Sequence, residues 1–189
     1  MYYKSRRCYV QNNCRTVKED MRLVWLQHVY WMRMLLISIA ERLADLPEVT
    51  DRLMQNPADI AEVFERFYSA EVTEPVEALL TEHLKIGAEL ITALRDNQKE
   101  RAAELTKLWY ANADDTAKAF SALNPYYDFD MLVEMLHTHL DLTIAEVAAH
   151  LAGKYKESID EFDEVEREAV AMADMFSSGI MRQFPGCFA

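Results

Sequence analysis

Glycine is scarce in this sequence, and its scarcity excludes one large class of protein. Only four of the 189 residues are glycines, and no two of them are neighbours. A loop that cradles phosphate needs several glycines close together, because its backbone must approach the anion and adopt positive φ angles. We therefore expect neither a P-loop nor a Rossmann enzyme, and no bound nucleotide.

Cysteines and long apolar runs are also few. The three cysteines, Cys8, Cys14 and Cys187, are too few and too peripheral for a disulfide framework, and we interpret them as reduced thiols. Residues 1–20 lack the apolar core of a secretory signal. The longest apolar run, at residues 31–40, contains Arg33 and is too short to span a bilayer. These features predict a cytoplasmic protein without a membrane span.

Acidic residues outnumber basic ones, and the excess is unevenly distributed. The net charge is −12, yet residues 1–18 carry five basic residues and no acid. The other 15 basic and 32 acidic residues give the rest of the chain a charge of −17. A body this acidic repels phosphate backbones, so we expect no nucleic-acid partner. We interpret residues 1–15 as a basic, poorly ordered segment.

Helical patterns dominate residues 16–185, which we expect to form a single all-α domain. Apolar residues make up 51% of the chain, enough to bury a core at this length. They recur at three- and four-residue steps, the pattern of helices with one buried face, and no segment alternates like a strand. Short loops between about six helices predict an antiparallel bundle. The expected helices begin after Thr16, near Val49, after Thr73, after Asn97, before Leu132 and near Tyr155.

Capping residues and helix breakers define several of the expected ends. Thr16 and Asn97 are each followed three residues later by glutamate, the pattern of a capping box. Asn56, which precedes a proline, is typical of a new helix start inside the second segment. Thr143 is predicted to bend or restart the fifth helix, and Gly153 to end it.

The sequence contains an internal repeat whose copies follow one another at nearly equal intervals. Each copy places a histidine three residues after a tryptophan or leucine, and polar residues follow in the return segment. The interval corresponds to one helical hairpin, so the repeat predicts three hairpins that bury their apolar faces against each other. The repeated positions are His28, His83 and His139, then Asn56 with Asp59, Asn112 with Asp115, and Asp174 in a weaker third copy.

Residues 20–185 also carry a resemblance to a known family. They resemble an uncharacterised family of small all-helical proteins from Gram-positive bacteria, some members of which carry the label acetylglutamate kinase. That label does not fit these residues, because an amino-acid kinase needs an α/β sheet and glycine-rich phosphate loops. The architecture is also similar in kind to ferritin-like and haemerythrin-like bundles, an analogy of fold alone. The resembling motifs are Trp25-x-x-His28-x-x-Trp31-x-Arg33, Trp109-Tyr-x-Asn112-Ala, Asn124-Pro-Tyr, His139-Leu-x-Leu-Thr, and Met172-Ala-Asp174 with Gln183-Phe-Pro.

His28, His83 and His139 are the side chains best placed for chemistry, since all three fall on apolar faces. A buried polar group without a partner costs about 1–3 kcal/mol, so each ring needs a partner. In one interpretation each histidine forms a hydrogen bond across the bundle. In the other, the three converge and bind Fe, Zn or Mn together with carboxylates. The candidate carboxylate ligands are Glu146, Glu166 and Asp174, and the residues expected to support the ligands are Asn56, Asn112, Asp59 and Asp115.

The two remaining histidines are expected at the surface. Glu134-x-x-His137 matches the Glu-x-x-His motif of di-iron bundles, but such a site needs two copies and the sequence contains one. His150 is likewise expected to be exposed. The sequence shows no Ser-His-Asp or Cys-His constellation, so it does not indicate an enzyme of either kind.

Two functions follow from these interpretations. The first is a metal-binding bundle with a buried site of histidines and carboxylates, which stores or senses metal or handles dioxygen. The alternative is a non-catalytic interaction protein, or a protein that binds an apolar small molecule, in which the histidines are structural. Ten methionines would make such a pocket adaptable. An exposed apolar face would favour a homo-oligomer.

Overall fold

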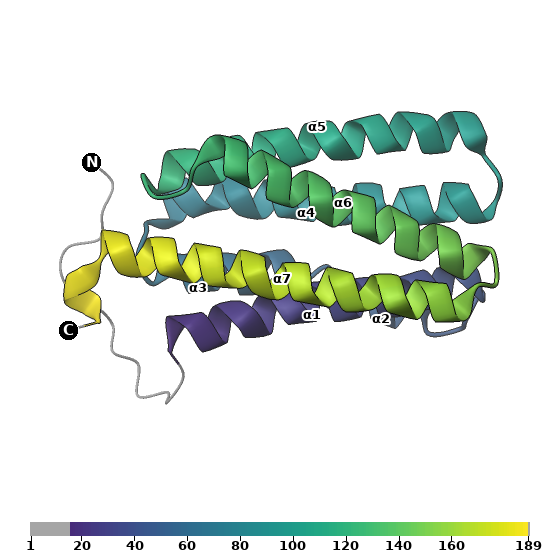
Figure 1. Cartoon of the computed structure of the whole chain (residues 1–189), viewed down its shortest axis with the longest axis horizontal. Coiled ribbons are helices and arrows are strands. Elements are labelled where there is room, and N and C mark those ends of the chain that lie inside the picture. Colours follow the sequence, from purple (N-terminus) through teal and green to yellow (C-terminus); the bar gives the residue numbers. More distant parts are fainter. Residues whose placement is uncertain (1–15, 189) are drawn as a thin grey trace.

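The computed structural model describes residues 16–188, which form a bundle of α-helices (Figure 1). This part of the chain contains no β-strand, as the apolar pattern predicted. The expected disorder of residues 1–15 lies outside the described residues, as do Cys8 and Cys14. The elements are α1 (Val17–Ala40), α2 (Leu46–Leu53), α3 (Asn56–Glu65), α4 (Ala70–Arg95), α5 (Lys99–Leu123), α6 (Phe129–Leu151), α7 (Tyr155–Gln183) and the short 3₁₀-helix η1 (Pro185–Cys187).

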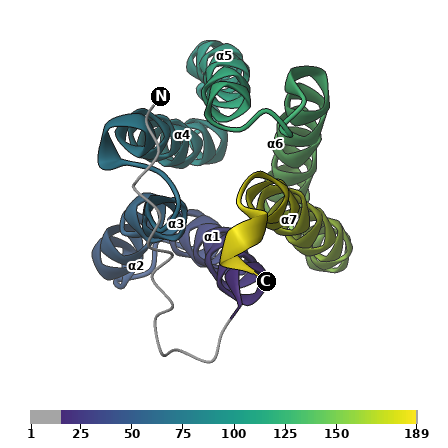
Figure 2. The ribbon, with the colours of Figure 1, turned by 90° about the vertical axis from the view of Figure 1, so that its left-hand side faces the viewer.

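The helices surround a common axis when the bundle is viewed from one end (Figure 2). Helices α1, α4 and α6 contact one another, and they are the helices that carry the three candidate histidines. Helix α3 contacts both α1 and α4, α5 contacts both α4 and α6, and α7 contacts both α6 and α1. The central trio therefore has a further helix packed against each of its three sides, while α2 covers α1.

Two predicted helix starts are confirmed. The Thr16 side chain accepts a hydrogen bond from the Glu19 amide, and the Glu19 carboxylate accepts one from the Thr16 amide, so the capping box is complete. The second expected helix is interrupted where Asn56 and its proline predicted, but Asn56 is the first residue of the new helix and not its cap, which is Gln55. It consists of α2 and α3, which brings the number of α-helices from the expected six to seven in residues 16–188.

The capping box predicted at Asn97 is wrong. Asn97 has a φ of 55° and follows α4, and the Gln98 amide donates to the Ala93 carbonyl. Asparagine tolerates this left-handed conformation, so Asn97 ends α4 instead of starting α5. The restart of the helix predicted at Thr143 is also wrong. Its hydroxyl donates to the carbonyl one turn earlier, and α6 continues without a break to Leu151. Gly153, with a φ of 73°, follows the end of α6 as predicted.

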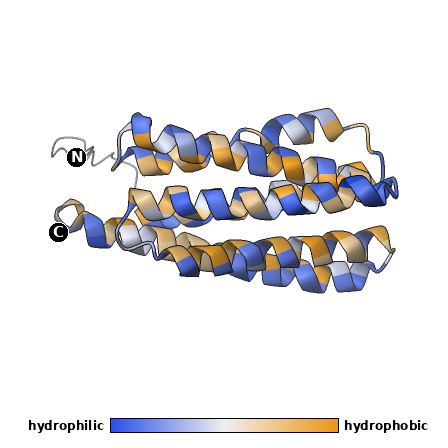
Figure 3. Ribbon diagram, turned by 90° about the horizontal axis from the view of Figure 1, so that it is seen from above, coloured by the Kyte–Doolittle hydropathy of each residue, from blue (hydrophilic) through white to orange (hydrophobic). Residues whose placement is uncertain are grey.

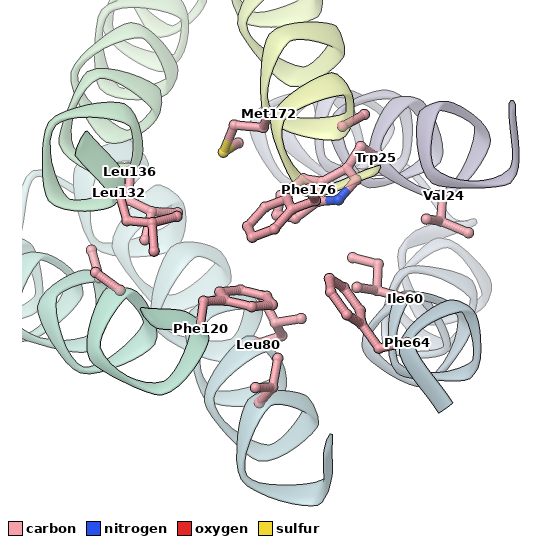
Figure 4. Close-up of a cluster of buried hydrophobic side chains, with 14 of the residues drawn as sticks. Val24, Trp25, Ile60, Phe64, Leu80, Phe120, Leu132, Leu136, Met172 and Phe176 are labelled. Carbon is pink, nitrogen blue, oxygen red and sulfur yellow. The ribbon is translucent and has the colours of Figure 1, made fainter. Parts of the chain in front are cut away.

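A cluster of aromatic rings joins the outer helices to α1 (Figure 4). Phe120 of α5 lies 5.4 Å from Phe64 of α3 and 4.4 Å from Phe176 of α7, measured between ring centroids. Trp25 of α1 stacks on Phe176 at 5.3 Å. Aromatic pairs contribute about 0.5–1.5 kcal/mol each beyond the area they bury. Hydrophobic and hydrophilic residues alternate around each helix (Figure 3), as a bundle with one such core requires.

Helix α1 is the one helix in residues 16–188 whose length and composition would allow it to cross a membrane. Half of its apolar window is buried inside the bundle, where it supplies Trp25 and His28 to the interior. A core helix in a bundle outside a membrane can have the same length and apolar composition. These two features of α1 are therefore weak support for a membrane span.

The segment after α7 folds back against the connection between α3 and α4. The ring of Phe184 lies 5.7 Å from Phe67 and 5.3 Å from Tyr68, and the Tyr68 hydroxyl donates to Gln183 Oε1 at 2.6 Å. Cys187 in this segment is disulfide-bonded, so the interpretation of all three cysteines as reduced thiols is wrong at this position.

Gly179 on α7 offers a test of this packing. A Cβ added there would lie 2.0 Å from Cε1 of Tyr127, whose hydroxyl is held by the Phe176 carbonyl at 2.6 Å. Because the ring cannot move away freely, we expect Gly179→Ala to lower the free energy of unfolding by about 1–3 kcal/mol, measured by urea denaturation. Gly186→Ala is the control, since nothing lies within 4 Å of its added Cβ. Equal stability of the two variants would contradict the packing.

Candidate metal centre

His28 of α1, His83 of α4 and His139 of α6 meet in the interior of the bundle. One ring nitrogen from each lies within 4.8 Å of the others, and the ring centroids are 5.6–6.2 Å apart. The three side chains are buried, with residue exposures of 2%, 6% and 4%. Within residues 16–188 they form the one group of three or more side chains whose atoms are close enough to share a metal ion.

The surroundings of the three rings are largely apolar. Trp25, Leu80 and Leu136 each precede one of the histidines by three residues, and all three line the small cavity beside the rings. Trp109 lies 5.1 Å from the His83 ring, and its indole nitrogen donates to the His83 carbonyl at 3.0 Å. The space in this cavity that is open to the centre of a water molecule is about 10 Å³. This is about the smallest volume that can hold one bound water.

Asn56, the first residue of α3, fixes the orientation of His28. Its Nδ2 donates to the Val24 carbonyl at 2.8 Å, so its Oδ1 must face the ring, 3.0 Å from His28 Nδ1. An amide oxygen only accepts hydrogen bonds, and His28 Nδ1 therefore carries the proton. The lone pair of His28 is then on Nε2. Asn56, predicted to support a ligand, therefore contacts His28 directly.

Asn112 of α5 stands in the corresponding relation to His83. Its Nδ2 donates to the Leu79 carbonyl at 3.1 Å, and Leu79 precedes His83 by four residues, just as Val24 precedes His28. The Asn112 side chain acts on His83 by favouring its protonated form. No hydrogen bond of standard geometry joins the two side chains. The buried Oδ1 of Asn112 has no hydrogen-bond partner in residues 16–188.

His139 has an acidic partner that the sequence reasoning missed. Its Nδ1 lies 3.0 Å from Glu168 Oε2, and since a carboxylate accepts, Nδ1 is again the protonated nitrogen. The interval along the chain from Asn112 to Glu168 equals the interval from Asn56 to Asn112. Continuing this constant spacing would have identified Glu168. Instead, Asp174 was predicted to be the acid of the third repeat. The structure places Asp174 beside Arg22.

Burial makes His28 and His83 hard to protonate. Desolvation, with a smaller contribution from the neighbouring His139 and against the opposing effect of Asn56, lowers the pKa of His28 to about 3. Desolvation also lowers the pKa of His83 well below 6.5, with contributions from both other histidines. Both rings are therefore neutral near pH 7, and each has one nitrogen with a free lone pair.

Most of the acids predicted to complete the site lie outside the histidine group. Both carboxylate oxygens of Asp174 accept from Arg22 at 2.7 Å, and Lys18 lies 3.1 Å away. Glu166 interacts with the Tyr30 hydroxyl near the surface. Asp59 is 3.5 Å from Arg52, and Asp115 is exposed. The structure therefore does not bring these residues to the three rings.

Glu146 is buried, as the sequence suggested, but its partner is Arg33. The carboxylate and the guanidinium form a salt bridge, and Arg33 also donates to the Ser158 carbonyl at 3.3 Å. Burial raises the pKa of Glu146 to about 7, against the opposing effect of Arg33. Glu146 interacts electrostatically with His139 but does not belong to the group of side chains that could share an ion.

The other two histidines also differ from each other. His137 is partly exposed and lies 2.7 Å from Asp114, which agrees with the expected surface position. His150 is buried, with 8% exposure, so the expectation of an exposed ring is wrong. It packs against Tyr155, and Glu41 lies 3.6 Å from its Nε2. Neither residue joins the metal-binding group.

Comparison with known proteins does not identify the site. No family model, curated protein or solved structure matches this chain. The resemblance to the helical family of Gram-positive bacteria therefore stays a prediction from the motifs, and the site is interpreted from its own geometry.

The neutral histidines predict how stability depends on pH in chelator-treated protein. Between pH 6.5 and about 3 the unfolded chain binds more protons at His28 than the folded chain, so stability falls as pH falls through this window. Glu146, with a raised pKa, contributes the opposite slope between about 4.5 and 7. His83 adds to His28, and the histidines outweigh this single carboxyl.

Replacing His28 should therefore reduce the pH dependence. We expect His28→Gln to decrease the slope of unfolding free energy by about 1.4 kcal/mol per pH unit between pH 4.5 and 6, measured by urea denaturation. His137→Gln, at a partly exposed ring, is the control and should keep the wild-type slope. An unchanged slope in the His28 variant would show that the ring is not kept neutral by burial.

Proposed function

We propose that the bundle binds one transition-metal ion, of which zinc is the best match, through His28, His83 and His139. The observation that supports this most is the convergence of three buried imidazoles from three separate helices inside an otherwise apolar core. Chance burial of one histidine is common in bundles, but three rings that gather with their nitrogens together need a common explanation. A shared cation supplies it.

The distances support an ion at the centre of the three nitrogens. If the nitrogens were 4.8 Å apart, the maximum separation, the central point would lie about 2.8 Å from each. Zinc–nitrogen bonds are about 2.0–2.1 Å, so each ring would move inward by about 0.7 Å at most. Small changes in side-chain torsions achieve such a shift. The hydrogen bonds at Nδ1 of His28 and His139 leave their Nε2 atoms for the ion.

The ligand set favours zinc over iron or manganese. Imidazole suits several transition metals, but manganese and non-haem iron usually take carboxylate oxygens as well. The acids considered for that role, Glu146, Glu166 and Asp174, are engaged with Arg33, Tyr30 and Arg22. Three histidines with one open position form a well-known zinc ligand set. Zinc therefore needs no further side chain here.

The size of the cavity limits what the ion can do. The space beside the rings holds about one water molecule, so the fourth ligand would be water or hydroxide. A storage protein needs room for many ions, and dioxygen chemistry needs room for a diatomic ligand beside the metal. We infer that retention or sensing of a single ion fits this site better than storage or dioxygen chemistry.

We also infer that the bundle consists of three copies of one hairpin. The three histidines are nearly evenly spaced along the chain, and their asparagine and glutamate partners are evenly spaced. Phe64, Phe120 and Phe176 of the aromatic cluster recur at the same interval as those partners. In this proposal the first return segment is α2 with α3, and the later ones are α5 and α7. The metal site then lies where the three copies meet.

The alternative is a protein whose buried histidines are structural. The contact of Asn56 with His28 favours it, because this ring already has one satisfied nitrogen without an ion. The packing of Trp25 and Trp109 against His28 and His83, at 5.8 and 5.1 Å, would then be the main role of these rings. A protein of this kind would act through binding to another molecule, and a metal would not stabilise it.

Metal binding distinguishes the two proposals. We expect protein purified without chelator, then stripped and titrated, to bind one Zn²⁺ per chain, measured by competition with a chromophoric chelator and by elemental analysis. Because Zn²⁺ binds the folded state, it should stabilise the chain by about 2.7 kcal/mol at a free concentration of 100 times the dissociation constant. Co²⁺ should give the strong visible absorption of a four-coordinate ion.

Variants locate the site. His83→Gln and His139→Gln should each abolish the Co²⁺ absorption and the stabilisation by Zn²⁺. His137→Gln and His150→Gln, outside the histidine group, should retain both. If the wild-type chain binds no Zn²⁺, or the His83 and His139 variants bind it as tightly, the structural alternative is correct.

A further inference from the structure

We propose that Glu168 is the positioning residue of the metal centre, which acts on the bound ion through His139. This inference depends on the proposed function, since it concerns the same three-histidine site. Glu168 would hold His139 in place, keep its proton on Nδ1 and supply a negative charge in direct contact with a ligand. The inference adds to the proposed function the residue whose negative charge favours a divalent cation at this site.

The contacts of Glu168 fit this role. Its Oε2 lies 3.0 Å from His139 Nδ1, and its side chain is 10% exposed against 5% for the histidine. The second carboxylate oxygen, Oε1, is buried and has no hydrogen-bond partner in residues 16–188. The nearby basic residues Arg22 and Arg33 pair with Asp174 and Glu146. Glu168 therefore interacts with a metal-ligand candidate and with no arginine or lysine in the described chain.

A buried carboxylate in this position needs a compensating positive charge. Removing an ionised carboxylate from water costs several kcal/mol unless a cation lies close by. Within residues 16–188 the one hydrogen bond to this carboxylate comes from His139 Nδ1. A divalent ion on the far side of the same ring provides the charge, because the imidazole transmits the polarisation between its two nitrogens. Carboxylate–histidine–metal chains of this kind raise the basicity of the histidine ligand.

The three partner positions differ in one respect. Asn56 and Asn112 are amides that also bind a backbone carbonyl of the neighbouring helix, whereas Glu168 is an acid and has no such bond among the contacts of residues 16–188. An amide at the third position would also accept from a histidine Nδ1. Hydrogen bonding alone therefore does not explain the acid, and the charge is the property that distinguishes it.

Glu168→Gln tests the charge with little change in shape. We expect it to weaken Zn²⁺ binding by about 10–100-fold in the chelator competition and to shift the Co²⁺ visible spectrum, because His139 becomes a weaker ligand. The stability of the metal-free chain should not fall, because an uncompensated buried charge is removed. Glu166→Gln, two residues earlier and beside Tyr30, is the matched control and should bind like the wild type.

The outcomes separate this inference from the proposed function. If wild type binds no Zn²⁺, the metal centre itself is wrong. If wild type binds and Glu168→Gln binds equally tightly with the same Co²⁺ spectrum, the centre stands and the role of Glu168 is overturned. If Glu168→Gln does not fold, Glu168→Asp decides, since its shorter side chain keeps the charge but moves away from Nδ1. Weaker binding with a shifted spectrum supports the proposal, and unchanged binding overturns it.

Discussion

Burial of three imidazole rings at one point is the constraint on which the rest of this bundle depends. Each ring is polar, so each needs a hydrogen-bonding partner that cannot come from the apolar side chains around it. The outer helices supply polar residues to the rings: Asn56 of α3 and Glu168 of α7 form hydrogen bonds with His28 and His139, and Asn112 of α5 acts on His83 without a hydrogen bond of standard geometry. The outer helices must therefore pack in a register that presents these residues to α1, α4 and α6.

The aromatic cluster helps to set that register. Phe64, Phe120 and Phe176 each follow one of the polar partners by eight residues on the same helix, and their rings contact one another. A slip of any outer helix by one turn would separate these rings and would also remove the partner from its histidine. Apolar packing and polar pairing thus specify the same arrangement, and this agreement between the two favours a single native state.

The sequence predicted the helices and the histidines well, but not the acids. Periodicity identifies a buried face, and it placed His28, His83 and His139 on such faces, because an apolar stripe needs only local spacing. The partners of a buried acid depend on contacts between distant helices, which spacing within one helix does not contain. Glu146 was predicted as part of a buried site, and it is buried. Its partner, Arg33, lies 113 residues away along the chain, so local spacing could not identify it. The prediction of a helix start at Asn97 was wrong for a local reason. Asparagine is common both before a helix and in the left-handed conformation that ends one.

The burial of the site also determines how an ion would reach it. Because the three histidines are exposed by 6% or less, an ion bound there would enter or leave only when helices separate, and local opening would set its rate of exchange. The segment between α1 and α4 is broken into α2 and α3, whereas α5 and α7 are continuous. Asn56 lies at that break and holds His28. Shorter helices have fewer internal hydrogen bonds to lose, so this corner should open first, and an ion released there would leave through the side of the bundle nearest α3.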